Sequence, residues 1–266
     1  MLISEPRFEF RRGPDLVSDP KSRFSHRAEY YSKYRPKYPN SVLQYLGQKL
    51  GFSRNSVVAD IGSGTGIFAE LLLQSGNTVF GIEPNDDMRA IAETNLRSYK
   101  RFKSIKGSAE STTLPSASVD FITAAQSFHW FDHASARVEF LRILRKPGWV
   151  VLVWNTRRKS TPFLEAYDRL VRGKAFEGCR ASREDLSQTV FSNFLGRPLT
   201  VKLSNSQECD EEALKGRVMS ASYSPLPGDP LHKEVLDSVS ELFRRYQVNG
   251  RVTFEYDTEV YTGQLR

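Results

Sequence analysis

The chain has 266 residues, of which 39% are hydrophobic and 26% are charged, the balance of an ordinary soluble globular protein. No stretch approaches the roughly 20 apolar residues of a membrane-spanning helix, and the amino terminus lacks an apolar run of the signal-peptide type, so we expect a cytoplasmic protein. The net charge of +7 is spread along the chain, so the charge pattern argues against a nucleic-acid partner.

Two helices are predicted before the first strand. Residues 24–34 have a helical pattern that Pro36 and Pro39 cut off, and Asn40 is placed to cap a second helix that carries Leu43, Leu46 and Leu50. We expect segment 1–50 to form a leader and lid helices at the ligand edge of a sheet.

From residue 51 to 156, short β-branched runs alternate with helical patterns. The predicted strands are 56–61, 78–82, 102–106, 121–125 and 149–154. This alternation is typical of a parallel sheet covered by helices. Gly76 is predicted to end the first of these helices, Asn85 or Asp86 to cap the next, and Asp132 to begin one that Pro147-Gly148 ends.

Segment 157–266 has a different pattern. Residues 163–174, 211–220 and 231–246 are predicted to be helical, and residues 253–262 alternate as a strand does. We expect this segment to supply a substrate lid and the strands that complete the sheet.

The densest motif is the run Asp60-Ile61-Gly62-Ser63-Gly64-Thr65-Gly66, which follows an apolar strand. Glycines at the end of a strand let a ligand approach the backbone closely. A dinucleotide-binding loop has GxGxxG spacing, whereas this loop has GxGxG, and Ile67 occupies the place of the third glycine. The spacing therefore argues against NAD.

Two acidic residues near the loop indicate which ligand groups it could bind. A carboxylate at Asp60 would repel a pyrophosphate, yet it suits the ammonium of a methionine moiety. Glu83 ends the second strand, where an acid accepts hydrogen bonds from a ribose diol. The alternative is a glycine-rich turn followed by an unrelated surface acid.

Several motifs together resemble the class I S-adenosylmethionine-dependent methyltransferases, in particular the small-molecule branch with ubiquinone-biosynthesis-type and trans-aconitate-type enzymes. Besides the loop, they include Gly107-Ser108-Ala109-Glu110, Phe128-His129-Trp130-Phe131, Leu144-Arg145-Lys146-Pro147-Gly148 and Ser220-Ala221-Ser222-Tyr223. The resemblance implies a doubly wound, Rossmann-like α/β fold, with a seven-stranded sheet, a helical lid and S-adenosylmethionine as the cofactor.

The resemblance also assigns cofactor-binding residues. It places Asp60 and Gly62 at the methionine end and Glu83 at the ribose. Ser63, Gly64 and Pro84 are further candidates for cofactor binding. It places Ser108 and the Ala109 backbone at the adenine, and Glu110 is a further candidate for cofactor binding. Gln126 would offer its backbone to the amino acid portion of the cofactor, and the alternative is an ordinary loop residue. Many relatives have an aspartate at position 108, and Ser108 is a weaker acceptor.

Tyr34 and Arg35 are candidates for the lid. A guanidinium can bind the carboxylate of the cofactor through two hydrogen bonds, which makes Arg35 a fitting partner. The alternative is a solvated helix end.

Methyl transfer from a sulfonium depends mostly on alignment in a site without bulk water. His129 is the best-placed general base for a hydroxyl or amine acceptor, unless it only packs or orients its loop. A carboxylate acceptor needs no base, and Arg157 would then hold it. Cys179 and Cys209 lack CxxC spacing, and no ligand cluster predicts a metal.

The sequence thus predicts a methyltransferase for a small-molecule acceptor, with a carboxylate or a hydroxyl as the methylated group. Two alternatives stay open. One is an RNA or protein methyltransferase with the same cofactor fold, and the other is a non-catalytic protein that binds S-adenosylmethionine.

Overall fold

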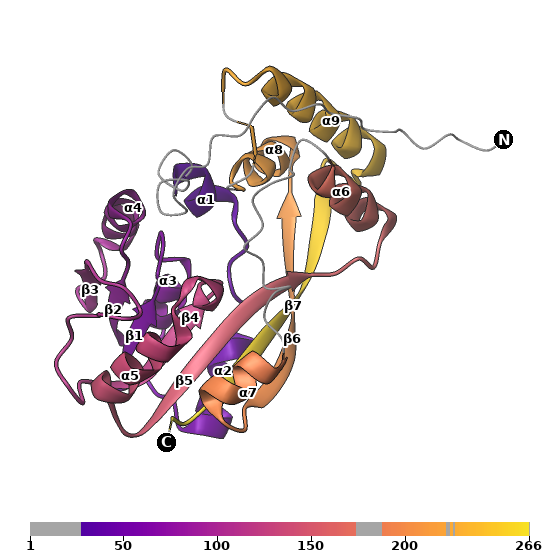
Figure 1. Cartoon of the computed structure of the whole chain (residues 1–266). Coiled ribbons are helices and arrows are strands. Elements are labelled where there is room, and N and C mark those ends of the chain that lie inside the picture. Colours follow the sequence, from indigo (N-terminus) through magenta and orange to yellow (C-terminus); the bar gives the residue numbers. More distant parts are fainter. Residues whose placement is uncertain (1–27, 174–187, 222–223, 226, 266) are drawn as a thin grey trace. The chain divides into compact units, whose positions relative to one another are not determined.

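The computed structural model describes residues 28–173, 188–221, 224–225 and 227–265 (Figure 1). The expected leader, the first residues of the helix predicted from Phe24, and Cys179 lie outside this part of the chain. The described residues form two compact units. We call residues 36–156, 188–205 and 256–265 the sheet unit and residues 28–35, 157–173, 206–221, 224–225 and 227–255 the helical unit.

A seven-stranded sheet confirms the predicted α/β fold class. The strands are β1 (Val57–Ile61), β2 (Thr78–Ile82), β3 (Phe102–Ile105), β4 (Val119–Ala125), β5 (Leu144–Arg157), β6 (Leu199–Cys209) and β7 (Val252–Gly263). Their order in the sheet is β3-β2-β1-β4-β5-β7-β6. β1 pairs in parallel with both β2 and β4, β2 with β3, and β4 with β5. The strands β5, β6 and β7 contribute residues to both units.

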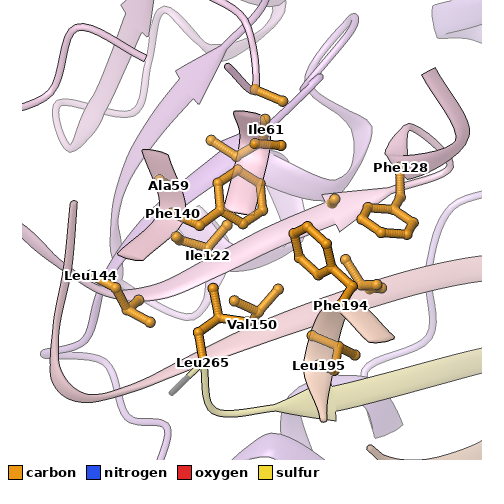
Figure 2. Packing of buried hydrophobic residues seen from close by; sticks show 14 of the residues in the cluster. Ala59, Ile61, Ile122, Phe128, Phe140, Leu144, Val150, Phe194, Leu195 and Leu265 are labelled. Carbon is orange, nitrogen blue, oxygen red and sulfur yellow. The ribbon is translucent and has the colours of Figure 1, made fainter. Parts of the chain in front are cut away.

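Helices cover both faces of the sheet in the sheet unit, because successive strand residues point to opposite faces. On β5, Val150, Leu152 and Trp154 join one buried cluster, whereas Val151 and Val153 join the other. The first cluster includes residues of α5 (His133–Ile143) and α7 (Gln188–Leu195), several of which are labelled in Figure 2. The second includes residues of α2 (Ser41–Leu50), α3 (Ile67–Gln74) and α4 (Asp86–Leu96).

The strand order reverses between β1 and β4. The chain first adds strands on one side of β1, as β2 and β3, and then crosses to the other side with β4 and β5. In an open parallel sheet, ligands bind outside the carboxyl ends of the strands at such a switch point. The loops after β1 and β4 therefore lie where this fold binds ligands.

Local signals account for most of the helix ends. The side chain of Asn85 accepts a hydrogen bond from the Met88 N–H, and that of Asp132 accepts one from Ser135, so both predicted caps are confirmed. Gly76 has a φ of +90° and follows α3 in a Schellman motif, as its prediction required. Asn40 precedes α2, but its side chain makes no capping hydrogen bond.

The prediction that Pro147-Gly148 ends a helix is wrong. Helix α5 ends at Ile143, and the chain is already extended from Leu144, so Pro147 and Gly148 lie within β5. Pairing of Leu144 with Val119 of β4 begins the strand early. Two further elements, α7 and β6, were not predicted.

The helical unit contains α1 (Ala28–Tyr34), α6 (Pro162–Arg172), α8 (Glu211–Met219) and α9 (Pro230–Tyr246). Within it, α1 packs against α8, and α9 packs against both α6 and α8. Its interior is aromatic, because Phe163 and Tyr167 contact Phe254, and the Arg217 guanidinium lies 4.4 Å above the Phe254 ring. In the part of the chain that the structure describes, none of the helices is long and apolar enough to span a bilayer.

Candidate functional site

The glycine loop after β1 folds back on the end of β2. The backbone N–H groups of Gly62 and Ser63 both donate to the carbonyl of Ile82, at 2.8 and 3.1 Å. Gly62 has a φ of +64°, and a Cβ atom at this position would lie 2.6 Å from the Cβ of Ser127. A side chain at Gly62 would therefore push apart the loops that follow β1 and β4.

Asp60 is a carboxylate almost without solvent contact. Its side chain is in β1, 1% exposed, and accepts a hydrogen bond of 2.7 Å from the hydroxyl of Thr123 in β4. Burial raises the pKa of Asp60 to about 7, the hydrogen bond from Thr123 acts in the opposite direction, and the charge of Glu83 adds to the rise. A cation beside Asp60 would favour its ionised form, so the position suits a positively charged ligand group.

Glu83 connects the end of β2 to the glycine loop. One carboxylate oxygen accepts from the Gly64 N–H and the other from the Asn85 N–H beyond Pro84, both at 2.9 Å. Burial raises the pKa of Glu83, although these two hydrogen bonds and the charge of Arg89 oppose the rise. A carboxylate has about four acceptor positions, so Glu83 can still accept hydrogen bonds from hydroxyl groups of a ligand.

The loop after β3 holds the candidate adenine-binding residues. Ser108 and Ser111 exchange backbone hydrogen bonds of 3.0 and 3.3 Å, which closes a turn around Ala109 and Glu110. Ala109 is buried, and the carboxylate of Glu110 accepts from the Asp132 N–H at 2.9 Å. The turn is thereby connected to the loop that follows β4.

The loop after β4 is strained and aromatic. Gln126 has a φ of +59°, which is uncommon for a residue with a side chain and is often found at functional sites. The Ser127 hydroxyl donates to the Ile61 carbonyl at 2.7 Å, which attaches this loop to β1. His129 is half-buried, its ring centroid lies 4.9 Å from that of Trp130, and Trp130 is 41% exposed.

The other predicted site residues belong to the helical unit. The Tyr34 hydroxyl donates to Glu212 at 2.8 Å, and the Arg35 Nε donates to the Ser220 hydroxyl at 3.0 Å. Arg157 donates to Asp168 at 2.8 Å and lies 4.7 Å above the Tyr167 ring.

Asp168 also binds Lys159 and Arg172, each at 2.9 Å. Burial acts to raise the pKa of Asp168, but hydrogen bonds from Lys159, Arg172 and Arg157 outweigh it and lower the pKa to about 2. Three cations therefore surround a single ionised carboxylate.

The structure brings eleven of the predicted site residues to the carboxyl ends of β1 to β4 in the sheet unit: Asp60, Gly62, Ser63, Gly64, Glu83, Pro84, Ser108, Ala109, Glu110, Gln126 and His129. Tyr34, Arg35 and Arg157 are in the helical unit. Sequence reasoning missed Thr123 and Ser127, which bind Asp60 and the end of β1, and Glu139, which binds the loop after β3. Among the residues that the structure describes, no group of three or more His, Cys, Asp or Glu side chains is placed to hold a metal ion.

The chain is similar to several methyltransferases in sequence. A family model described as a methyltransferase domain matches residues 59–152. An uncharacterized methyltransferase of Bacillus cereus is 31% identical over 151 residues, which are 51% of this chain and 67% of that protein. One from Schizosaccharomyces pombe is 25% identical over 88% of this chain and 93% of its own length. One from Mycobacterium tuberculosis is 35% identical over 48% of this chain and about half of its own length, 49%.

A solved structure shares the fold. It is described as a putative type II methyltransferase from Anaeromyxobacter dehalogenans, and it superimposes with a TM-score of 0.69 at 21% identity. The superposition covers 87% of this chain and 98% of that one. At this identity the likeness concerns the arrangement of the helices and strands.

Proposed function

This chain belongs to the class I S-adenosylmethionine-dependent methyltransferases, and from that membership we propose that it transfers a methyl group to a small-molecule acceptor that carries a carboxylate or a hydroxyl group. We assign the cofactor to the loops at the carboxyl ends of β1, β2 and β3. Residues 1–50 and 157–266 would supply the lid.

Two buried carboxylates beside the glycine loop support the cofactor assignment. Asp60 favours a cationic group, which suits the ammonium of the methionine moiety, and it would repel a pyrophosphate. Glu83 retains acceptor positions for a ribose diol. The turn from Ser108 to Ser111 offers backbone groups for the adenine.

The main support for a small-molecule acceptor comes from the loop after β4. It presents Gln126, His129 and the exposed ring of Trp130 at the switch point. Enzymes that methylate the amino group of a nucleobase usually have an Asn or Asp-Pro-Pro-aromatic run at this place, and this chain has Ala125-Gln126-Ser127-Phe128. An aromatic ring with a few polar groups suits a small organic molecule.

A transfer assay tests the acceptor class. Purified protein is incubated with cofactor that carries a labelled methyl group, in parallel with a metabolite library, total tRNA and a protein extract. We expect label in a small ester or ether, with no loss of activity in EDTA. Label in tRNA or protein alone would overturn the proposal, and absence of label in all three would favour a binding protein without catalytic activity.

Glu83 offers a test of the cofactor assignment that does not need the acceptor. Glu83→Ala removes the hydrogen bonds to the ribose, so the affinity for S-adenosylhomocysteine should fall by about 1.5 to 3 kcal/mol, as measured by calorimetry. Glu83→Gln should cost less, because the amide keeps one acceptor oxygen. If both variants bind as the wild type does, Glu83 does not hold the ribose. Binding of NAD, with no binding of S-adenosylmethionine or S-adenosylhomocysteine, would contradict the cofactor assignment itself.

A further inference from the structure

Glu139 is a buried carboxylate on α5 that the proposed cofactor contacts do not include. Its side chain accepts from the Thr112 N–H at 2.8 Å and the Thr112 hydroxyl at 2.5 Å. It also accepts from Arg142 Nε and Nη2, both at 2.7 Å. The hydrogen bonds from Arg142 are the main reason that the pKa of Glu139 is lowered to about 2, so this carboxylate stays ionised at physiological pH.

Thr112 lies in the loop between β3 and β4, directly after the turn that Ser108 and Ser111 close. It is completely buried, and its hydroxyl also accepts from the Leu114 N–H at 3.3 Å. Thr113 has a φ of +63°, an uncommon conformation that the surrounding contacts must hold. This loop has no strand or helix of its own, so Glu139 supplies contacts that a ladder of backbone hydrogen bonds supplies elsewhere.

There is little room for the turn to adopt another position. A Cβ atom at Gly107 would lie 3.0 Å from the Ser111 carbonyl oxygen and 3.2 Å from that of Thr112. On the other side of the turn, Ala109 is buried and Glu110 binds the Asp132 N–H. A shift of Thr112 would therefore move Ser108, Ala109 and Glu110 with it.

We propose that Glu139 is the positioning residue of the adenine subsite, because it fixes Thr112 and thereby the turn that would contact the base. This inference rests on the proposed function, which assigns the turn to adenine. Backbone groups recognise a base only where they are held at hydrogen-bonding distance, so a displaced turn loses the ability to tell one base from another. Glu139 acts through the turn and does not itself touch the ligand.

Glu139→Gln weakens this network with little change of shape, because the neutral amide loses the charge that strengthens the hydrogen bonds from Thr112 and Arg142, and its NH2 group would face only donors. The probes are S-adenosylhomocysteine and S-inosylhomocysteine, which differ only at the base, and calorimetry gives both dissociation constants. We expect the variant to bind S-adenosylhomocysteine about tenfold more weakly. The ratio of the two affinities should fall towards one. A merely structural role would weaken both ligands equally and leave the ratio unchanged.

A matched control is available in the same unit. Like Glu139, Asp120 accepts from a backbone N–H, that of Val57 at 2.8 Å, and from an arginine, Arg145 at 3.0 Å. Asp120 lies near the start of β4, and neither of these partners belongs to the loop after β3. Asp120→Asn should lower stability without changing the ratio. Thr112→Val replaces the hydroxyl with a methyl group and should shift the ratio in the same direction as Glu139→Gln, whereas Thr112→Ser keeps the hydroxyl and should keep the wild-type ratio.

The outcomes separate the two proposals. If the wild type binds neither S-adenosylmethionine nor S-adenosylhomocysteine, the proposed function has failed. If it binds S-adenosylhomocysteine and both Glu139→Gln and Thr112→Val keep the wild-type ratio, the function stands and Glu139 is not a positioning residue. Should Glu139→Gln not fold, the Thr112 variants decide the question alone.

Discussion

Asp60 combines a buried carboxylate with a negative neighbour, and its charge therefore depends on what else is present. Without a ligand, burial and Glu83 raise its pKa from 3.8 to about 7. Between these two values the folded protein keeps a proton that the unfolded chain loses. The free energy of unfolding therefore decreases as pH rises from about 4 to about 7, and above pH 7 Asp60 adds no further change.

Asp60→Asn should remove this dependence. We expect the variant without ligand to melt at a higher temperature than the wild type at pH 8, with a smaller difference at pH 5. The affinity for S-adenosylmethionine should rise with pH up to about 7 in the wild type, because the ammonium favours ionised Asp60, and should be weaker and flatter in the variant. Thermal melts and calorimetry from pH 5 to 8 test both expectations, and parallel profiles for the two proteins would contradict them.

The same residues illustrate how far sequence reasoning reaches at this scale. Asp60 and Glu83 could be predicted to lie at one edge, because Asp60 is near the end of one strand, Glu83 directly follows the next, and both belong to motifs with known spacing. Glu139 could not, because its partner Thr112 lies 27 residues earlier in a loop without periodicity. Contacts of this kind depend on tertiary packing, which a local pattern does not encode.

At the scale of elements, helices α1 and α8 approach closely because Gly216 has no side chain. A Cβ atom at Gly216 would overlap the ring of Tyr34, whose hydroxyl binds Glu212 one turn earlier on α8. Gly216→Ala should therefore destabilise the protein by about 1 to 3 kcal/mol, the usual cost of overpacking, although alanine favours a helix by up to about 1 kcal/mol. Denaturant unfolding measures the difference.

Gly47 provides the control for this substitution. It lies in the middle of α2, is exposed, and a Cβ atom there would only touch the Phe52 carbonyl oxygen at 3.4 Å. Gly47→Ala should be neutral or stabilising by up to about 1 kcal/mol. The double variant Tyr34→Ala, Gly216→Ala should lose no more stability than Tyr34→Ala alone. Equal effects of alanine at Gly47 and Gly216 would mean that the close approach of α1 and α8 does not matter.

Elements with strong local patterns could be predicted, and those without could not. β2 begins and ends where its β-branched run does, at Thr78 and Ile82. The strand β5 is much longer than predicted, because pairing with β4 extends it back through Pro147. The helix α7 has only eight residues, and β6 is half-exposed along most of its length, so neither has the long apolar run that would have identified it.

At the scale of the whole molecule, the two compact units interleave segments that are far apart in the chain. The helical unit takes residues before Pro36, after Thr156 and between β6 and β7. A division in chain order, such as 1–50, 51–156 and 157–266, follows local composition and cannot anticipate this arrangement. The division therefore remains a proposal about function, with the cofactor-binding core in the middle segment and lid elements in the outer two.

The two candidate catalytic residues belong to different units, His129 to the sheet unit and Arg157 to the helical unit, and they imply different acceptors. Arg157, Lys159 and Arg172 all bind the carboxylate of Asp168. A guanidinium group suits an anionic acceptor, so we expect Arg157 to hold a carboxylate and this carboxylate to be methylated. A carboxylate is already ionised at neutral pH and needs no general base.

Substitution of the two residues tests this expectation on the acceptor that the transfer assay identifies. Arg157→Ala should raise the KM for the acceptor by about 10- to 100-fold, because a hydrogen bond to a charged group is lost. His129→Ala should keep kcat within a few-fold of the wild type. Arg172→Ala is the matched control, since it removes a different cation from the same Asp168 carboxylate. If Arg172→Ala raises KM as much as Arg157→Ala, the effect belongs to the Asp168 network. A loss of about 10² to 10⁴ in kcat for His129→Ala would instead identify a general base and a hydroxyl acceptor.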